Sequence, residues 1–254
     1  MDTLKQRVKK GYSRPWVVRK YATMGLWPSE EALCGQFWPG GIRVLDVGCG
    51  AGRTTAPLSI RGYRVTALDL SLPMVAETAE QCARLNSEAG LTVADATDLP
   101  FSGGAFQGAL FSYNGIELVP GRSGKLKVLE ELHRVLAPGG HLIFTTHAIE
   151  ALNRFALYRL KRLLWFGFTR LLRVPTPERE VGEIVYDPDQ NLEVYYMQVI
   201  SPRSYRGMLA SAGFDLVYYN SRQRVGRSPL PRWIVDLDPE LKFYVARKRD
   251  EEMP

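Results

Sequence analysis

One glycine-rich stretch constrains this chain of 254 residues more than any other: residues 43–53, Arg-Val-Leu-Asp-Val-Gly-Cys-Gly-Ala-Gly-Arg. The apolar run at 42–47 is rich in β-branched residues, which is typical of a buried strand in a parallel sheet. The glycines that follow stand at alternate positions: Gly48, Gly50 and Gly52. Glycine adopts positive φ and has no Cβ, so the backbone there can approach a ligand closely. Asp46 stands at the carboxyl end of this strand, where open α/β sheets bind their ligands.

A second acid follows at the end of the next expected strand, residues 64–70. Asp69 lies 23 residues beyond Asp46. An acid about 20 residues after the glycines, on the adjacent strand, is where a ribose diol needs its acceptor. A carboxylate can accept both hydroxyl protons at once. Arg53 stands where the third glycine of the G-x-G-x-x-G pattern would be, which argues against a nicotinamide-dependent dehydrogenase. A plain glycine-rich surface loop is the other alternative.

Four motifs in this order resemble those of the class I S-adenosylmethionine (SAM)-dependent methyltransferases. They are Asp-x-Gly-x-Gly-x-Gly at 46–52, the acid-plus-small pair Asp95-Ala96, Asp-Leu-Pro-Phe at 98–101 and Arg-Val-Leu-Ala-Pro-Gly-Gly at 134–140. The resemblance covers residues 40–147 well and 201–247 loosely. It implies SAM as methyl donor and S-adenosyl-L-homocysteine as product. It also implies that Asp95 accepts from the adenine amino group and that Met74 packs near the cofactor.

The expected fold is a doubly wound α/β fold, with a mostly parallel seven-stranded sheet and helices on both faces. In family terms, the last strands, 214–220 and 241–246, include an antiparallel edge strand. We expect four segments: an N-terminal helical segment over the cofactor and acceptor site (1–39), the SAM-binding core (40–147), an acceptor-binding lid (148–200) and the C-terminal part of the core (201–254). The lid is an insertion before the last helix, with a helix and then a hairpin whose turn falls at 187–191.

The motifs and strand ends together predict a set of cofactor-binding residues: Asp46, Gly48, Cys49, Gly50, Gly52, Arg53, Asp69, Leu70, Met74, Asp95, Ala96, Ser112 and Tyr113. No metal is expected, because the three cysteines lack metal-ligand spacing. They are Cys34, Cys49 and Cys82. An odd number of cysteines without a disulfide framework favours reduced thiols.

Two residues at strand ends are the catalytic candidates, His147 and Tyr113. Methyl transfer from a sulfonium is a direct displacement, so the protein must mainly position donor and acceptor. A base is needed only when the acceptor must lose a proton. His147 ends the fifth expected strand, and its ordinary pKa of about 6.5 suits that role; the alternative is a capping histidine. Tyr113 ends the fourth, where it would wall the cofactor, stack on the acceptor or only pack at the edge of the core.

Positive charge is concentrated in two segments, residues 1–20 with seven Lys/Arg and one acid, and residues 151–173 with six Lys/Arg and no acid. On a helical projection, the second segment has an apolar sector of Leu157, Leu160, Leu164, Phe168 and Leu171. Its arginines fall opposite. One interpretation packs the leucines on the domain and leaves the arginines in solvent. The other is a lid whose arginines attract an anionic substrate or an acidic membrane surface.

The predicted function is SAM-dependent methylation of a small molecule, with an anionic or lipid-like acceptor favoured by the basic segments and the methylated atom (O, N or C) left open. An RNA methyltransferase is the alternative that aromatic residues among basic ones suggest. A non-catalytic SAM-binding module is a third possibility. The chain has no run of 18 apolar residues, and a polar N-terminus is unlike a secretory signal, so we expect a cytoplasmic protein.

Overall fold

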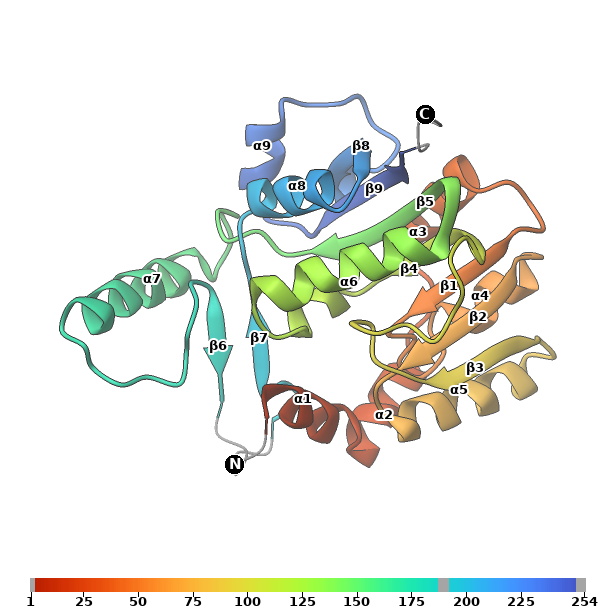
Figure 1. Cartoon of the computed structure of the whole chain (residues 1–254), viewed down its shortest axis with the longest axis horizontal. Helices are drawn as coiled ribbons and strands as arrows, with labels where there is room; N and C mark the ends of the chain where they lie inside the picture. Colours follow the sequence, from red (N-terminus) through yellow and green to blue (C-terminus); the bar gives the residue numbers. More distant parts are fainter. Residues whose placement is uncertain (1–2, 187–191, 250–254) are drawn as a thin grey trace.

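The described part of the chain, residues 3–186 and 192–249 of a computed structural model, is built around one seven-stranded sheet of order β3-β2-β1-β4-β5-β9-β8 (Figure 1). Its strands are β1 (Arg43–Val47), β2 (Arg64–Asp69), β3 (Ala89–Val93), β4 (Phe106–Phe111), β5 (Leu136–Thr146), β8 (Phe214–Ser221) and β9 (Lys242–Lys248). β1 to β5 pair in parallel, which brings their carboxyl ends to one edge. The predicted fold class is confirmed.

One detail of the prediction was wrong. Among the described strands of the seven-stranded sheet, β9 alone runs opposite to the others, because it pairs antiparallel with both β5 and β8. Two reversals cancel, so β8 at the edge runs in the same direction as β5. The reversed strand therefore lies one position inside the edge of the sheet. The sequence patterns of β8 and β9 are both apolar and do not distinguish an edge strand from its neighbour.

Helices cover both faces of the sheet. One face packs against α6 (Gly121–Val135) and α8 (Pro202–Ser211), and the other against α3 (Pro28–Phe37) and α4 (Thr55–Ile60), with α5 (Leu72–Arg84) beside α4 (Figure 1). Successive strand residues point to opposite faces, so Leu45 packs toward α6 while Val44 packs toward α3. A strand buried on both faces needs an unbroken apolar run.

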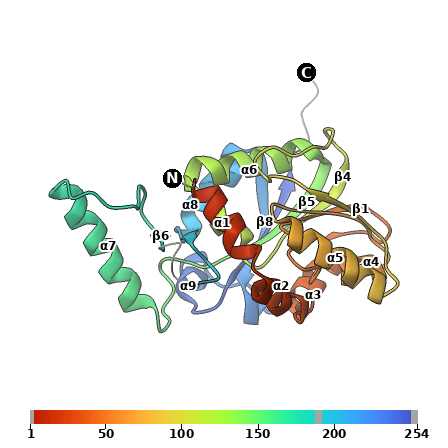
Figure 2. The same ribbon diagram turned by 90° about the horizontal axis from the view of Figure 1, so that it is seen from below.

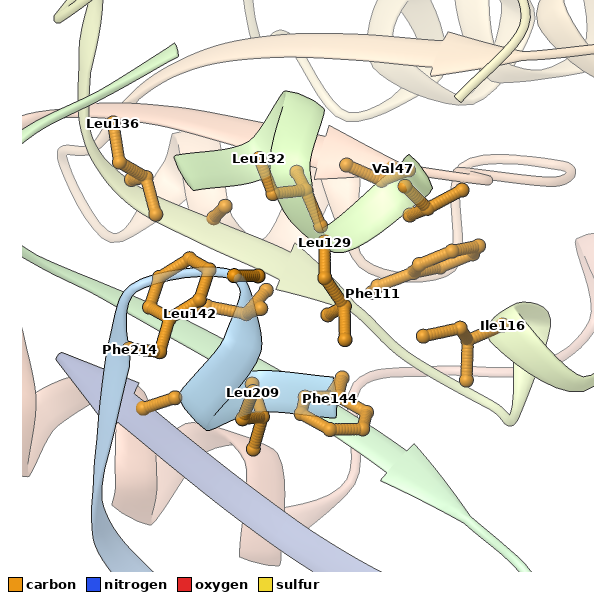
Figure 3. Packing of buried hydrophobic residues seen from close by; sticks show 14 of the residues in the cluster. Val47, Phe111, Ile116, Leu129, Leu132, Leu136, Leu142, Phe144, Leu209 and Phe214 are labelled. Carbon is orange, nitrogen blue, oxygen red and sulfur yellow. The ribbon is translucent and has the colours of Figure 1, made fainter. Parts of the chain in front are cut away.

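Helix α6 shows how the apolar periodicity becomes packing. Leu129 and Leu132 are fully buried and lie on the sheet against Phe111, Leu142 and Phe144 (Figure 3). Burying one such side chain stabilises the fold by roughly 1.5–3 kcal/mol. The leucines of α6 therefore face the protein.

The N-terminal segment and the insertion lie near the carboxyl ends of the strands. Helices α1 (Leu4–Tyr12) and α2 (Pro15–Ala22) precede α3, and α2 packs on α5. The insertion has a helix, α7 (Ala156–Leu171), and a two-stranded antiparallel pair, β6 (Glu183–Val185) with β7 (Tyr196–Gln198). The expected turn at 187–191 lies outside the described residues. Short elements complete the set: η1 (Gly115–Leu118), η2 (Arg222–Arg224) and α9 (Arg232–Leu237).

Helix α7 stands away from the sheet in both views (Figures 1 and 2). Its orientation is the reverse of the interpretation in which its leucines pack on the domain. Its apolar sector does not pack on the domain. The five side chains are 51–81% exposed: Leu157, Leu160, Leu164, Phe168 and Leu171. The arginine side turns inward instead. Arg159 donates to the carbonyls of Ile149 and Ala151, and Arg162 pairs with Glu178 at 2.5 Å.

The inversion has a physical reason. The chain that enters α7 and the chain that leaves it both run along its inner side, where they present carbonyl oxygens and one carboxylate. Arginine satisfies these acceptors, and leucine cannot.

None of the helices in residues 3–186 and 192–249 combines the length and the apolar character that crossing a membrane requires.

Candidate functional site

The loop after β1 needs its glycines for two different reasons. All three have positive φ, +63° at Gly48, +56° at Gly50 and +83° at Gly52. A Cβ at Gly48 would meet the Phe111 ring at 3.0 Å, and one at Gly52 would meet Thr78 at 3.2 Å. These two positions are close-packed. A Cβ at Gly50 would meet nothing within 4 Å. The backbone of Gly50 is therefore open to a cavity, which is where a ligand would lie against it.

That cavity has a volume of about 140 Å³ and lies at the carboxyl ends of β1, β2 and β4. It is lined by most of the predicted cofactor residues: Gly48, Cys49, Gly50, Arg53, Asp69, Leu70, Met74, Asp95, Ala96, Ser112 and Tyr113. Asp46 and Gly52 do not line it. In residues 3–186 and 192–249, no group of three His, Cys, Asp or Glu side chains could hold a metal ion.

Asp46 lies beneath the loop. Its Oδ2 accepts from the hydroxyls of Thr54 (2.6 Å) and Thr55 (2.7 Å), at the start of α4. Burial raises the pKa of Asp46 to about 6, although the two hydroxyls oppose that shift. Its Oδ1 is buried without a hydrogen-bond partner among the described residues. Asp46 thus links the end of β1 to the helix that follows the glycines.

Asp69 faces the cavity from the end of β2. Its two oxygens accept from the backbone N–H groups of Gly50 (3.0 Å) and Ser71 (2.8 Å). Burial raises the pKa of Asp69, and these backbone bonds offset part of the rise. A carboxylate has about four acceptor positions, so two hydroxyl donors can still be accommodated. Asp69 both shapes the glycine loop and suits a diol.

Asp95 sits at the other end of the cavity, where it is paired with Lys5 of α1. Thr97 also donates to Asp95 from its backbone N–H (2.9 Å) and its hydroxyl (2.8 Å). Burial alone would raise the pKa of Asp95, but Lys5 and Thr97 outweigh it and hold the pKa below its ordinary value. The N-terminal helix therefore closes this end of the cavity.

Arg53 lines the same cavity, but its charge is already matched. The guanidinium is bidentate to Glu30 of α3 at 2.8 and 2.6 Å, and it donates to Ser112 at 2.7 Å. The side chains of Arg53 and Glu30 are 4% and 0% exposed. Arg53 also lies over the rings of Trp27 and Tyr113. The pair fastens α3 to the glycine loop. Sequence reasoning missed Glu30, since nothing in the pattern of α3 indicates a partner 23 residues away.

A second and larger cavity, about 630 Å³, lies between the insertion and the strand ends. Tyr113 lines both cavities, so they meet at this residue. The second cavity is walled largely by aromatic and aliphatic side chains, among them Trp27, Tyr158, Phe166, Ile184 and Met197. Such a lining suits a small apolar or aromatic ligand.

His147 lines the second cavity and is paired with a buried acid. Its Nδ1 lies 2.7 Å from Oε2 of Glu117, and its backbone N–H donates to Oε1 at 2.6 Å. Glu117, in η1, is 1% exposed at its side chain. Burial lowers the pKa of His147, but the charge and hydrogen bond of Glu117 outweigh it, so the pKa lies above its ordinary value. A carboxylate on one ring nitrogen fixes the tautomer and leaves Nε2 for a ligand. Sequence reasoning did not identify Glu117. The only sequence signal for it was an acidic residue shortly after the end of an expected strand.

The backbone between the cavities is strained. Tyr113 and Asn114 follow β4 with φ of 49° and 62°, a region that non-glycine residues rarely adopt. Asn114 lines the second cavity, and its buried Oδ1 has no hydrogen-bond partner among the described residues. Strain of this kind gathers at ligand sites. The structure thus brings Tyr113, Asn114 and His147 to one wall.

Comparison with known proteins agrees with this geometry. Residues 44–140 match a family model described as a methyltransferase domain. The chain is 31% identical over 179 residues to a ubiquinone/menaquinone biosynthesis C-methyltransferase of Geotalea daltonii, covering 68% of this chain and 67% of the relative. It is 34% identical over 117 residues to a demethylmenaquinone methyltransferase of Clavibacter sepedonicus, where the match spans 45% of this chain and only 46% of the relative.

A SAM-dependent methyltransferase structure from Methanosarcina mazei has the same fold, with a TM-score of 0.67 at 23% identity over 90% of this chain and all of that one. The fold and the site define a Rossmann-like domain with a glycine-loop cavity. The chain belongs to the class I SAM-dependent methyltransferases.

Proposed function

We propose that this chain transfers a methyl group from SAM to a small hydroxylated aromatic molecule of the quinol type. The observation that carries the proposal is the meeting of two cavities at Tyr113, one at the glycine loop and one beside the His147–Glu117 pair. Transfer requires donor and acceptor in contact. A shared wall between their cavities meets that requirement.

The residues present fit the cofactor. Gly50 offers open backbone, Asp69 has acceptor positions for two ribose hydroxyls, and Asp95 is a carboxylate at the far end for the adenine amino group. When bound, SAM supplies an electrophilic methyl group on a sulfonium and leaves as S-adenosyl-L-homocysteine. The protein must then hold the acceptor and remove its proton.

His147 is positioned to remove a proton from the acceptor. A phenolic hydroxyl has a pKa near 10, close to that of tyrosine, so few molecules are ionised at neutral pH. In the proposed step Nε2 takes the hydroxyl proton. The electron pair left on oxygen, which is delocalised onto the ring carbon, would then attack the methyl group that bound SAM supplies. If the ring carbon is methylated, it must afterwards lose its own proton to restore the aromatic ring. Glu117 holds Nδ1–H and stabilises the imidazolium that forms.

The acceptor class rests on the lining of the second cavity and on the names of relatives. Aromatic walls favour a planar ring. The relatives' names refer to menaquinone and ubiquinone, whose reduced rings carry two hydroxyls. No observation favours RNA. Two of the N-terminal cations are paired within the chain, Lys5 with Asp95 and Lys20 with Glu193.

The test is transfer of labelled methyl from SAM to a short-chain quinol. The wild type should label it, with and without ribonuclease. His147→Ala should lower turnover by about a hundredfold while SAM affinity by calorimetry stays unchanged. His141→Ala, in the middle of β5, lines neither cavity; it serves as the control and should turn over normally. SAM binding without transfer to quinols, lipid extracts or RNA would leave a SAM-binding module and refute the proposal.

A further inference from the structure

The outward face of α7 is an apolar surface that the proposed reaction does not use. Five side chains of its apolar sector are 51–81% exposed. We call this surface the α7 face: Leu157, Leu160, Leu164, Phe168 and Leu171. Trp165 borders it, 53% exposed, and also lines the second cavity. Soluble surfaces rarely gather so many large apolar side chains unless they meet a partner. Figures 1 and 2 show that α7 projects from the body, so the face is accessible.

The charges of this segment have one sign. Lys161, beside the apolar sector, and Arg154, before the helix, are exposed. Arg170 and Arg173 are also exposed but lie on the opposite side of the helix, where Arg170 donates to the Glu178 carbonyl. Residues 151–177 include no acid. An apolar helical face bordered by Trp165 and Lys161, in a segment with cations and no anions, has the composition of a helix that lies in a membrane interface. Anionic headgroups would complement the cations, while the apolar face enters the acyl boundary.

We propose that α7 lies in the surface of an anionic lipid bilayer, with the α7 face in the lipid and the basic side chains at the headgroups. The chain does not span the bilayer in this arrangement. It is held at the surface by one helix, and the sheet remains in water.

A second copy of the chain fits the α7 face less well. A two-fold contact places the same surface on both partners, so the unbalanced cations of one copy would face those of the other.

The position of α7 links the membrane to the acceptor. Its inner side walls the second cavity through Phe166 and Thr169, while its outer side is the α7 face. A docked helix would hold the cavity beside the lipid, so a lipid-like acceptor could enter without crossing water. This consequence rests on the proposed function, whereas membrane docking itself does not.

The experiment is co-sedimentation of the purified full chain with vesicles of phosphatidylcholine containing 30% phosphatidylglycerol, with pure phosphatidylcholine as comparison. Wild type should bind the anionic vesicles at least tenfold more tightly, and 0.5 M salt should weaken that binding severalfold. Leu160→Ser with Leu164→Ser should reduce binding at least tenfold. Lys161→Glu should reduce binding to anionic vesicles but not to neutral ones. Ile60→Ser removes a similarly exposed side chain, 57%, from α4 and should bind as wild type.

A fluorescent probe gives a second readout. The three native cysteines are buried, so Leu164→Cys can be labelled selectively with an environment-sensitive dye. Its emission should shift to the blue on anionic vesicles, while the same dye at Ile60→Cys should not respond. Absence of binding to both vesicle types would overturn the proposal. So would a dimer in solution that Leu160→Ser with Leu164→Ser dissociates. SAM affinity and transfer to a short-chain quinol should be unchanged in these variants, so failure of docking is distinguishable from failure of the proposed reaction.

Discussion

Helices α6 and α7 both have a leucine-rich sector, and they use it in opposite ways. In α6 the leucines are buried against the sheet, and in α7 they face out while the arginines face in. The difference lies in what each helix meets. α6 meets the apolar face of the sheet, whereas the inner side of α7 meets chain segments that present carbonyls and Glu178. Amphipathic periodicity therefore marks two faces of a helix without saying which one meets the protein.

The two regions also differ in how charge is used. In the core, Arg53 and Glu30 form a bidentate pair that is almost wholly buried. In the insertion, Arg162 and Glu178 remain 32% and 12% exposed at their side chains. Because solvent screens the second pair, we expect the core to depend on its ion pair far more than the insertion does.

The largest expected effect concerns Glu30. Glu30→Ala leaves the Arg53 guanidinium buried without its carboxylate, which should cost about 3–5 kcal/mol, or a fall in Tm of roughly 6–20 °C for a chain of this size. Glu31→Ala is the matched control, since Glu31 lies on the same helix and forms an exposed pair with Arg61; it should cost at most about 1 kcal/mol. Thermal unfolding of both variants checks this. An equal fall in Tm for the two variants would contradict the expectation that the buried pair contributes more stability than the exposed one.

The second prediction compares the two leucine sectors directly. Leu132→Ala in α6 should cost about 2–5 kcal/mol, because it leaves a cavity in the core. Leu164→Ala in α7 should change stability by no more than about 0.5 kcal/mol, because that side chain is 66% exposed. Denaturant unfolding measures both free energies. A loss above about 2 kcal/mol for Leu164→Ala would show that the α7 leucines pack on the protein after all.

The third prediction concerns Asp69. Asp69→Ala removes the proposed acceptor for the ribose hydroxyls, which should cost about 1.5–3 kcal/mol of binding, or roughly ten- to hundredfold in SAM affinity. It also strands the N–H groups of Gly50 and Ser71, so Tm should fall as well. Leu72→Ser, an exposed change close by, is the control. Calorimetric titration that finds equal SAM affinity in the folded variant would remove Asp69 from the cofactor site.

The fold and the glycine-loop cavity could be predicted because their signals are local. The residue types of Gly48, Gly50 and Asp69, and their positions at strand ends, were enough to predict that they line this cavity. The partners of Arg53 and His147 could not be predicted, because Glu30 and Glu117 reach them only through the tertiary fold. The side of α7 that faces the protein could not be predicted for the same reason. Its orientation depends on the carbonyls of segments that the pattern does not describe.

The pH dependence of kcat in wild type and Glu117→Gln tests the central claim most directly, namely that His147 and Glu117 act together on the acceptor. The base must be neutral, and Glu117 raises the pKa of His147 above its ordinary value, so wild-type kcat should fall as pH drops through an apparent pKa above about 6.5. Glu117→Gln removes the charge that raises the pKa, so the acid limb should move to lower pH and the plateau should fall by about ten- to hundredfold. An acid limb at the same pH in both proteins, with equal plateaus, would contradict the account.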